Sequence, residues 1–458
     1  MDAIISNALV ITQDAERRII PDGAVAILGD SIAQVGTTGE VRAAHPTLAT
    51  VDARGKAVLP GFVNAHTHNV LLVLRGTVED MTGGAVYGYM SPITFAMEPE
   101  ERSAIAALGC LEAIRSGTTT LVDPLRHVAT YAQAMADSGL RLYLSESCAD
   151  ARTLEIRHGT YEYDRAWGEA FLDRARALLE GFHGNDNGRV QCMVAAHAAD
   201  NCSPWMLDEL RELAERHGVR RTVHLAQSQA EVDQVQAAHG RTPAQYLDDH
   251  GWAAPDVLGA HWSFCTPEDV DLLASRGTHM AHCPHSGSRR GTPRSPVTKI
   301  REAGVNISLG TDNMSEDMLA ALHSGISAHR ANLGGGVSPT PQVMFDAATR
   351  NGAAAIGREH DLGSIEAGKK ADLALINLNH PSMRPISSIV SNIVHYGHPG
   401  IVDSVMVDGR FLMQGGTILG MDEEAVVAEA QRAVDAVWAR FGQQFPDIAP
   451  RVGVTPGV

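Results

Sequence analysis

Short apolar runs alternate with amphipathic stretches through most of the chain after residue 60. The apolar runs predict eight strands, at residues 61–64, 118–122, 141–145, 190–196, 221–224, 257–261, 278–282 and 306–309. Apolar residues spaced three and four apart predict helices between them, at residues 101–116, 167–182, 204–217, 267–275 and 318–331. Because parallel strands need connections of helix length, the alternation predicts an α/β fold with a (β/α)8 TIM-like barrel. The chemistry of such a barrel lies at the C-terminal ends of its strands.

The two ends of the chain carry a different pattern, of short strands separated by turns. Apolar runs predict strands at residues 4–11, 24–28, 32–35, 371–376, 404–407 and 411–413. The last two are joined by Asp408-Gly409, which is typical of a tight hairpin. We therefore expect a small β-sandwich built from both chain ends, a helix at 423–441 and a trailing arm after it. The predicted division is a sandwich part at 1–58, the barrel at 59–362, and a second sandwich part with the terminal helix at 363–458.

The charge balance excludes several kinds of partner. The 458 residues include 37 Lys and Arg against 54 Asp and Glu, a net charge of −17, so we expect no nucleic-acid partner. The chain start has no basic leader, and no apolar run approaches the ~20 residues that span a bilayer, so we expect a soluble cytoplasmic protein with no membrane partner. The six cysteines form no Cys-x-x-Cys pair, which predicts free, buried thiols.

Histidine carries the strongest chemical signal. His66 and His68 directly follow the first predicted barrel strand, and residues two apart in extended chain face the same side, so both imidazoles can reach one metal ion. Further candidates follow the later strands: His197, His224, His261, His282 and Asp312. Several imidazoles and a carboxylate suit Zn²⁺, with Fe²⁺ or Mn²⁺ open, and leave a position for water, which indicates hydrolysis. None of the four lysines lies at an interior strand end where a carbamylated lysine would bridge two metals, so we expect one metal ion.

Motifs along nearly the whole chain resemble the amidohydrolase superfamily. They are Leu59-Pro60-Gly61-Phe62 with His66-Thr67-His68, Gly117-Thr118-Thr119-Thr120, His224-Leu225-Ala226, Ala260-His261, Gly310-Thr311-Asp312-Asn313, and the stretch 363–373. Within the superfamily they are most similar to the branch of s-triazine hydrolases, atrazine chlorohydrolase among them, and nucleobase deaminases. The resemblance implies a homo-oligomer that acts on a small nitrogen-rich molecule.

The resemblance also implies roles for individual residues. His66, His68, His224 and Asp312 correspond to the metal ligands, and His261 corresponds to the histidine beside the activated water. Asp312 would also accept a proton from that water. The implied substrate contacts are His197, Gln227, Asn313 and His282. For His197 a hydrogen bond within its own loop is the alternative.

The sequence departs from the branch at the residue three after the fifth-strand histidine. Deaminases and triazine hydrolases place a proton-shuttling Glu there, whereas this chain has Gln227, whose amide does not titrate. Glu231, one helical turn further on, could substitute for that Glu, but a carboxylate on a solvated helix face is the preferred interpretation. Ser315 is expected to cap the next helix. Arg289, Arg290 and Arg294 could contact an anionic group of the substrate, but they are expected to lie in solvent. The aromatic residues and methionine of the loop 70–98 fit either a planar substrate or ordinary packing.

The function expected from these observations is hydrolysis. Hydroxide bound to a single metal ion displaces an amino-type group from a nitrogen-rich heterocycle, the reaction of a deaminase acting on a cyclic amidine. Because of Gln227, hydrolytic dehalogenation or cleavage of an amide or urea-like C–N bond stays open as an alternative. A non-catalytic scaffold that keeps the barrel is a remote third possibility.

Overall fold

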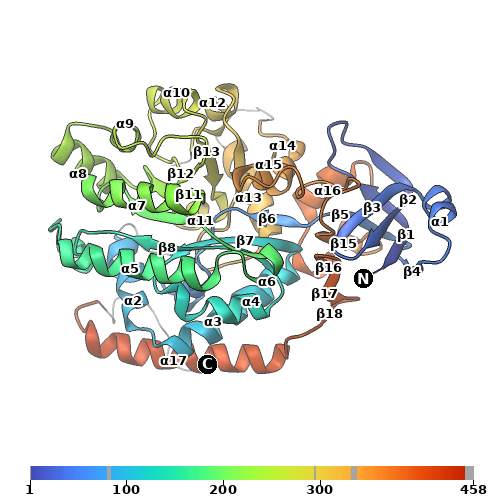
Figure 1. The fold of residues 1–458 in the computed structure, drawn as a ribbon, viewed down its shortest axis with the longest axis horizontal. Helices are drawn as coiled ribbons and strands as arrows, with labels where there is room; N and C mark the ends of the chain where they lie inside the picture. Colours follow the sequence, from blue (N-terminus) through green and yellow to red (C-terminus); the bar gives the residue numbers. More distant parts are fainter. Residues whose placement is uncertain (1, 80–83, 293–294, 332–337, 449–458) are drawn as a thin grey trace.

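The computed structural model describes residues 2–79, 84–292, 295–331 and 338–448, and it confirms the parallel barrel (Figure 1). The barrel strands in chain order are β6 (Phe62–Asn64), β7 (Thr118–Leu125), β8 (Arg141–Cys148), β10 (Val194–Ala198), β11 (Arg221–Leu225), β12 (Val257–His261), β13 (His279–His282) and β14 (Ile307–Leu309). Neighbouring strands pair in parallel in this same order, and β9 (Val190–Cys192) pairs with β8 beside them. Every predicted barrel strand therefore has its counterpart.

The first and last strands meet and nearly close the barrel. The N–H of Ala65 donates to the Leu309 carbonyl at 2.9 Å, and the N–H of Asp312 donates to the His66 carbonyl at 2.9 Å. Gly310 makes this close approach possible, because an added Cβ would lie 2.7 Å from the His66 carbonyl oxygen. Closure therefore sets the segments that carry His66 and Asp312 against each other.

Helices connect the strands and begin at polar caps. In α7 (Pro204–His217) the Ser203 hydroxyl accepts the Met206 N–H, and Gly218 ends the helix with a φ of 63°. The other predicted barrel helices are α3 (Pro99–Arg115), α5 (Arg165–Phe182), α10 (Pro267–Ser275) and α13 (Met318–Arg330). Shorter helices complete the ring: α4 (Ala132–Asp137), α8 (Gln229–His239), α9 (Pro243–Asp249), α11 (Pro284–Arg289), α12 (Val297–Glu302), α14 (Pro341–Ala348) and α15 (Arg350–Ala355). Apolar side chains of these helices pack against the strands to form the main core.

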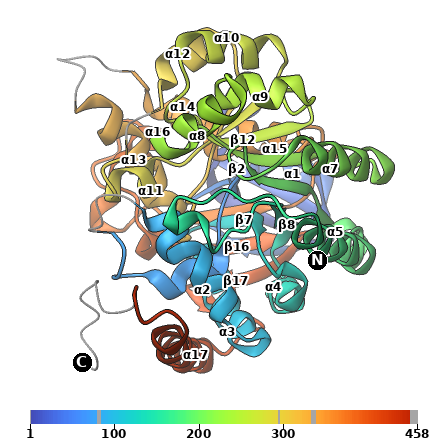
Figure 2. The same cartoon turned by 90° about the vertical axis from the view of Figure 1, so that its left-hand side faces the viewer.

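Strands from both chain ends fold together beside the barrel, as the sequence predicts, but in the described ranges they form one continuous nine-stranded sheet where a small β-sandwich was expected. Its hydrogen-bonded order is β18-β17-β16-β15-β5-β1-β2-β3, with β4 paired to β1. The bounds are β1 (Ala3–Ile11), β2 (Ile19–Leu28), β3 (Ser31–Thr37), β4 (Ala49–Asp52), β5 (Lys56–Pro60), β15 (Leu373–Asn377), β16 (Val402–Val407), β17 (Arg410–Gln414) and β18 (Thr417–Ile418). Asp408 and Gly409 make the predicted turn between β16 and β17, both with positive φ. In Figure 2 the barrel faces the viewer and this terminal sheet lies behind it. The domain bounds stay a prediction.

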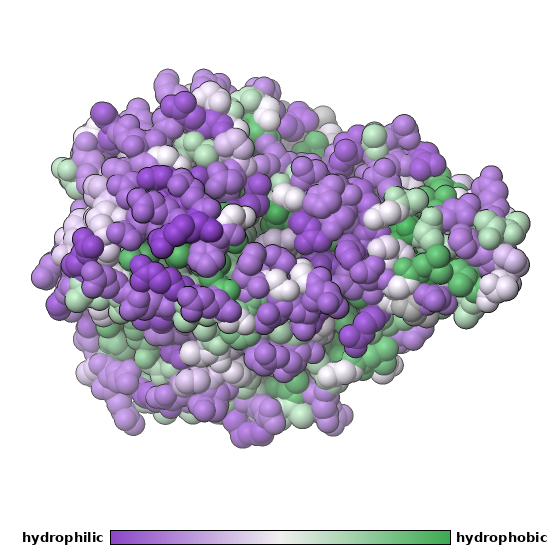
Figure 3. Space-filling model, in the orientation of Figure 1, coloured by the Kyte–Doolittle hydropathy of each residue, from purple (hydrophilic) through white to green (hydrophobic). Residues whose placement is uncertain are grey.

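The C-terminal helix α17 (Glu423–Gln444) returns from the terminal sheet and packs along α3, at the bottom of Figure 1. The face in Figure 3 is mostly hydrophilic, and hydrophobic residues show most clearly on the lobe of the terminal sheet. No helix in the described ranges is long and apolar enough to cross a bilayer. All six cysteines lie in those ranges and are free. The predicted trailing arm lies outside the described residues.

Candidate metal centre and active-site cavity

His66 and His68 leave the end of β6 with their rings on the same side. Both are buried, and their ring centroids lie 4.7 Å apart. Between them, Thr67 turns the other way, where its hydroxyl donates to Glu316 at 2.5 Å and its N–H donates to the Val122 carbonyl. The alternation expected for extended chain therefore aims both imidazoles into the mouth of the barrel.

The ends of three other strands bring their polar groups to the same point. His68 Nε2 lies 3.1 Å from His224 Nε2, and the Asp312 Oδ1 atom lies 3.5 Å from His68 Nε2 and 3.9 Å from His66 Nε2. Two overlapping sets, His66-His68-His224 and His66-His261-Asp312, hold their potential ligand atoms within 4.8 Å of one another. Segments far apart in the sequence therefore converge on a space the size of one cation.

The protonation states of these imidazoles suit a metal ion. His224 Nδ1 lies 2.6 Å from the His197 carbonyl, which can only accept, so Nδ1 carries the proton and the Nε2 lone pair is free. Both ring nitrogens of His66 are buried without a hydrogen-bond partner among the described residues. Burial lowers the pKa of His66 and His224 well below the ordinary value, and it lowers that of His68 to about 4. Neutral, orphaned imidazoles beside a carboxylate fit a divalent cation.

Asp312 is held in a strained, ordered position just after β14. Its φ is 66°, and its Oδ2 atom accepts from the Ser286 hydroxyl at 2.5 Å and from the Asn313 amide at 2.8 Å. Burial acts to raise the pKa of Asp312, but the interactions with His261, which is protonated only at acidic pH, and with the Arg290 guanidinium outweigh it and hold this pKa well below its usual range. Asp312 is therefore an ionised carboxylate with Oδ1 turned toward the histidines.

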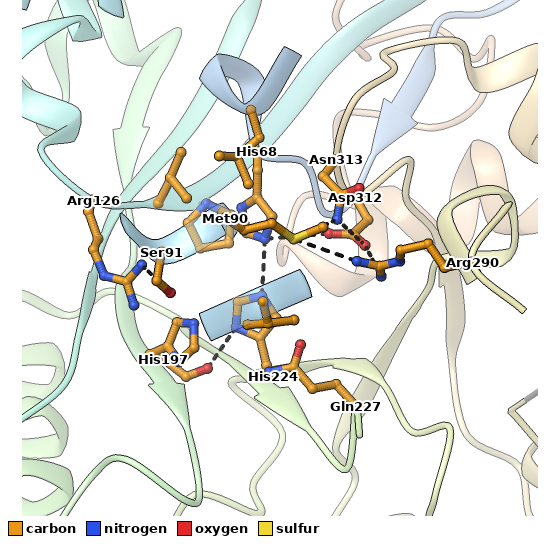
Figure 4. Close-up of a pocket in the computed structure, with 14 residues that line it drawn as sticks. His68, Met90, Ser91, Arg126, His197, His224, Gln227, Arg290, Asp312 and Asn313 are labelled. Atoms are coloured by element: carbon orange, nitrogen blue, oxygen red, sulfur yellow. Dashed lines mark hydrogen bonds and ion pairs between the residues drawn. The ribbon is translucent and has the colours of Figure 1, made fainter. Parts of the chain in front are cut away.

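A narrow inner cavity of about 30 Å³ lies over these groups (Figure 4). Its polar lining comes from His68, Ser91, Arg126, His197, His224, Gln227, Arg290, Asp312 and Asn313, and its apolar lining includes Leu71, Val86, Met90 and Leu125. A wider outer cavity of about 390 Å³ shares Val86, Gln227 and Arg290 with it and extends past His261. The site is thus a compact polar chamber below a larger, partly apolar mouth.

The structure places most of the predicted substrate contacts on this chamber. His197, Gln227 and Asn313 line the inner cavity, and the Asn201 amide lies 2.7 Å from His197 Nδ1. His197 therefore makes the hydrogen bond within its own loop and also lines the cavity. His282 lines a neighbouring cavity instead, where its Nε2 atom lies 2.9 Å from His329 Nε2.

Two expectations of solvent exposure are wrong. Glu231 is only 1 % exposed, because its carboxylate turns back to accept the N–H groups of Ala226 and Gln227 at 3.0 and 2.7 Å. Arg290 lies over the site, where its guanidinium contacts Asp312 Oδ2 at 3.4 Å, and Arg289 donates to the Asn313 carbonyl at 2.5 Å. Arg294 lies outside the described residues. Sequence spacing alone does not show in which direction these side chains point.

Sequence reasoning missed Arg126, Ser91 and Ser286 as parts of the site. Arg126 directly follows the end of β7 and lines the cavity. This position at a strand end is the one signal in the sequence that could have identified it. Ser91 and Ser286 sit in helical segments of the loops and carry no distinctive spacing. The loop 70–98 serves both expected purposes: Val86 and Met90 line the cavity, whereas Tyr89 is packed against Phe441.

A parallel barrel that gathers imidazoles and a carboxylate at its strand ends defines the class of metal-dependent barrel hydrolases. The amidohydrolase family matches residues 57–412, and a bacterial imidazolonepropionase-like composite domain matches residues 23–47. A 5-methylthioadenosine/S-adenosylhomocysteine deaminase of Pelotomaculum thermopropionicum is 31 % identical over 440 residues, which cover 94 % of this chain and 97 % of the relative. The chain belongs to the amidohydrolase family, which confirms the resemblance seen in its motifs.

Solved structures agree with this assignment. A zinc-bound adenosine deaminase of Xanthomonas campestris matches with a TM-score of 0.85 at 25 % identity, covering 96 % of this chain and 99 % of that one. A zinc complex of atrazine chlorohydrolase from Arthrobacter aurescens matches in fold, with a TM-score of 0.82 at 23 % identity and coverage of 94 % and 100 %. Together with the deaminase relative, the family makes this chain a hydrolase of C–N bonds other than peptide bonds, of the type that acts on cyclic amidines.

Proposed function

We propose that this chain is a zinc-dependent deaminase of amino-substituted nitrogen heterocycles, with His66, His68, His224 and Asp312 as ligands of a single ion. The observation that carries the proposal is the approach of His68 Nε2 and His224 Nε2 to 3.1 Å beside the Asp312 carboxylate. Without a shared cation, both ring nitrogens of His66 and the Nδ1 atom of His68 have no hydrogen-bond partner among the described residues, at a cost of about 1–3 kcal/mol for each group. Deaminase relatives and a zinc-bound structural neighbour support the same proposal.

Two residues manage the proton of the attacking water in this proposal. A divalent zinc ion in the site lowers the pKa of water and so supplies a nucleophile near neutral pH. Asp312, kept ionised and fixed by Ser286 and Asn313, is placed to accept a proton at Oδ1. Burial lowers the pKa of His261, so its imidazole is neutral at pH 7 and can hydrogen-bond the same water. His261 also lines the outer cavity, on the side from which a substrate arrives.

The substrate lies between His197 and Gln227 in this arrangement. His197 is fixed by Asn201 and faces the inner cavity from the end of β10, and Gln227 reaches it from the loop after β11. An amide donates and accepts hydrogen bonds, so Gln227 can orient a ring nitrogen and its amino group without exchanging a proton. The outer cavity has room for the remainder of a substituted ring. An amino group on a ring carbon next to a ring nitrogen is the substrate feature that these contacts recognise.

The test measures metal and leaving group together. The purified protein is expected to hold about one zinc ion per chain and to release ammonia from at least one member of a panel of aminopurines, aminopyrimidines, pterins and amino-s-triazines. Removal of zinc with 1,10-phenanthroline should abolish release, and added Zn²⁺ should restore it. His224→Ala should lose both metal and activity, because it removes a ligand. Release of chloride or alkylamine without ammonia, or full activity of metal-free protein, would contradict the proposal.

We further propose that the protein acts in the cytoplasm as a homo-oligomer. The resemblance to its family supports self-association. Light scattering of the purified protein after size exclusion gives the oligomeric state, and a single-chain mass would contradict the homo-oligomer.

A further inference from the structure

The inner cavity contains a buried arginine that the proposed deamination does not use. Arg126 follows β7, is 2 % exposed, and lines the cavity across from the metal centre. Figure 4 shows its guanidinium beside Ser91 and on the same side of the cavity as His197, away from Arg290. Its Nη1 atom donates to the Ser91 hydroxyl at 3.2 Å. The guanidinium is therefore anchored through one nitrogen at the wall of the inner cavity, where its Nε and Nη2 atoms are each almost fully buried.

The other two guanidinium nitrogens of Arg126 are unused. Among the buried side-chain nitrogens of the described residues, Arg126 is the one arginine that leaves both Nε and Nη2 without a hydrogen-bond partner. Glu146, whose charge acts on the pKa of Arg126, already accepts hydrogen bonds from Arg174 at 2.7 Å and from the Val128 N–H at 3.1 Å. Burial lowers the pKa of Arg126 to about 10, so the group is still a cation at neutral pH. A buried cation with no acidic partner is unfavourable until an anion joins it.

Other arginines of this chain show which group the Nε and Nη2 atoms of a guanidinium bind. Arg221 grips Asp256 with Nε and Nη2 at 2.8 Å each, and Arg276 grips Asp248 with the same two atoms at 2.7 and 2.9 Å. Arg141 holds Asp372 in this way at 2.9 and 3.1 Å. In each pair the two parallel N–H groups of one guanidinium edge meet the two oxygens of a carboxylate. Arg126 presents this edge with no protein carboxylate against it.

We propose that Arg126 binds a carboxylate of the substrate through Nε and Nη2, so that the substrate is an amino-substituted heterocycle bearing a carboxylate group. This inference rests on the proposed deaminase function. Leu71, Leu125 and Val86 in the cavity wall exclude water and strengthen the ion pair. Ser91 is a positioning residue, because it holds the guanidinium by Nη1 and leaves the other edge free.

The first experiment compares matched probes on the zinc-loaded protein. Ammonia release is measured from 4-aminopyrimidine-5-carboxylate and from its neutral isostere, 4-aminopyrimidine-5-carboxamide. We expect the carboxylate to be preferred in kcat/KM by at least about tenfold, since a charge-assisted bidentate pair is worth more than a neutral contact. Arg126→Met should remove the preference, and Arg126→Lys should keep only part of it, because an ammonium lacks the planar fork. Ser91→Ala should reduce the preference for the carboxylate less than either Arg126 variant does. An unchanged preference in Arg126→Met overturns the inference.

A binding measurement separates this inference from the proposed function. Calorimetric titration with nicotinate and nicotinamide needs no catalysis, and nicotinate is expected to bind at least about tenfold more tightly to the parent but not to Arg126→Met. If neither aminopyrimidine is hydrolysed while this difference holds, the deaminase proposal fails and the carboxylate site stands. If amino-heterocycles are hydrolysed but nicotinate shows no dependence on Arg126, the carboxylate site fails alone. Arg126→Lys retains the buried charge and serves as the folded comparison should Arg126→Met be unstable.

Discussion

At the scale of single residues, Gln227 separates this chain from the deaminases it resembles. The side chain lines both cavities, but an amide neither gives nor takes a proton between pH 4 and 10. Gln227→Glu places a titrating group beside the substrate, so we expect an additional ionisation in the pH profile of kcat/KM. The profile of ammonia release, recorded for parent and variant with the same substrate, provides the check.

Gln229→Glu is the matched control, because Gln229 lies two residues on and lines only the outer cavity. Gln229→Glu should show the same pH profile of kcat/KM as the parent. Identical profiles for parent and Gln227→Glu would show that Gln227 does not face the reacting atoms.

Asp123, a residue of β7, makes stability depend on pH. Its carboxyl is fully buried with a hydrogen bond from the Tyr131 hydroxyl at 3.1 Å, and burial raises its pKa to about 7. The unfolded chain releases this proton near pH ~4, so the folded state binds more protons between pH ~4 and 7 and loses stability as the pH rises through that window. Asp123→Asn cannot ionise. Its Tm relative to the parent should therefore increase from pH 5 to pH 8.

Differential scanning fluorimetry at both pH values measures this difference in Tm. The exposed Asp22→Asn is the control and should show the same difference at both. A Tm difference for Asp123→Asn that stays constant, or falls, would contradict the assignment of a protonated Asp123.

The candidate ligands could be found from sequence because each one lies at the end of a strand or just after it, and strand ends converge in a barrel. The directions in which the other side chains point could not be predicted from the sequence. Glu231 resembles an exposed helix residue in its spacing, yet two unpaired backbone N–H groups draw it inward. Arg126 belongs to no sequence motif. Only the structure shows that its Nε and Nη2 atoms have no hydrogen-bond partner among the described residues.

At the scale of elements, a hydrogen bond fastens the loop over the cavity to the barrel. The helical turn η2 (Val86–Met90) supplies Val86 and Met90 to the inner cavity, and the Tyr87 hydroxyl donates to Asp200 Oδ2 at 2.8 Å. Tyr87→Phe removes this bond to a buried carboxylate. We expect KM to rise by about tenfold, with kcat changed less, because the loop must be ordered by the substrate instead. Steady-state kinetics of ammonia release measures both parameters.

Tyr161→Phe is the comparison for this prediction. Tyr161 donates to the same Oδ2 atom of Asp200 at 3.2 Å, but it comes from a segment outside the two cavities that form the site. A similar rise of KM in both variants would mean that Asp200, rather than the anchoring of η2, is responsible.

Element positions followed from the sequence more readily than helix caps. Apolar runs located all eight barrel strands because each is buried on both faces and bounded by polar turns. The predicted start of α13 at residue 318 is correct, but its cap was wrong: Ser315 was expected to cap the helix, whereas Asp317 does so, accepting the N–H groups of Leu319 and Ala320. Ser and Asp are equally good caps, so local chemistry alone does not choose between them.

At the scale of the whole molecule, one buried ion cluster joins the barrel to the terminal sheet. Arg141 begins β8 and is 1 % exposed; it binds Asp372 at 2.9 and 3.1 Å and Asp408 at 2.5 Å. Both acids belong to the C-terminal part of the sheet, so the cluster joins β8 of the barrel directly to that part. Sequence patterns predicted that the ends fold together, but no local pattern shows which side chains join the two units, because that depends on their docking.

Arg141→Met tests this joint. It leaves the buried carboxylate of Asp372 and the partly exposed carboxylate of Asp408 without their cation, which should cost about 3–5 kcal/mol and lower the Tm by several degrees. Arg276→Met, which breaks the half-exposed pair with Asp248, should cost no more than about 1 kcal/mol. Arg141 lies at the N-terminal end of its strand, opposite the cavity, so the folded variant at 25 °C should keep the zinc content and kcat of the parent. Loss of zinc at a temperature where the circular dichroism is unchanged would instead mean that the terminal sheet helps to shape the metal centre through the length of the barrel.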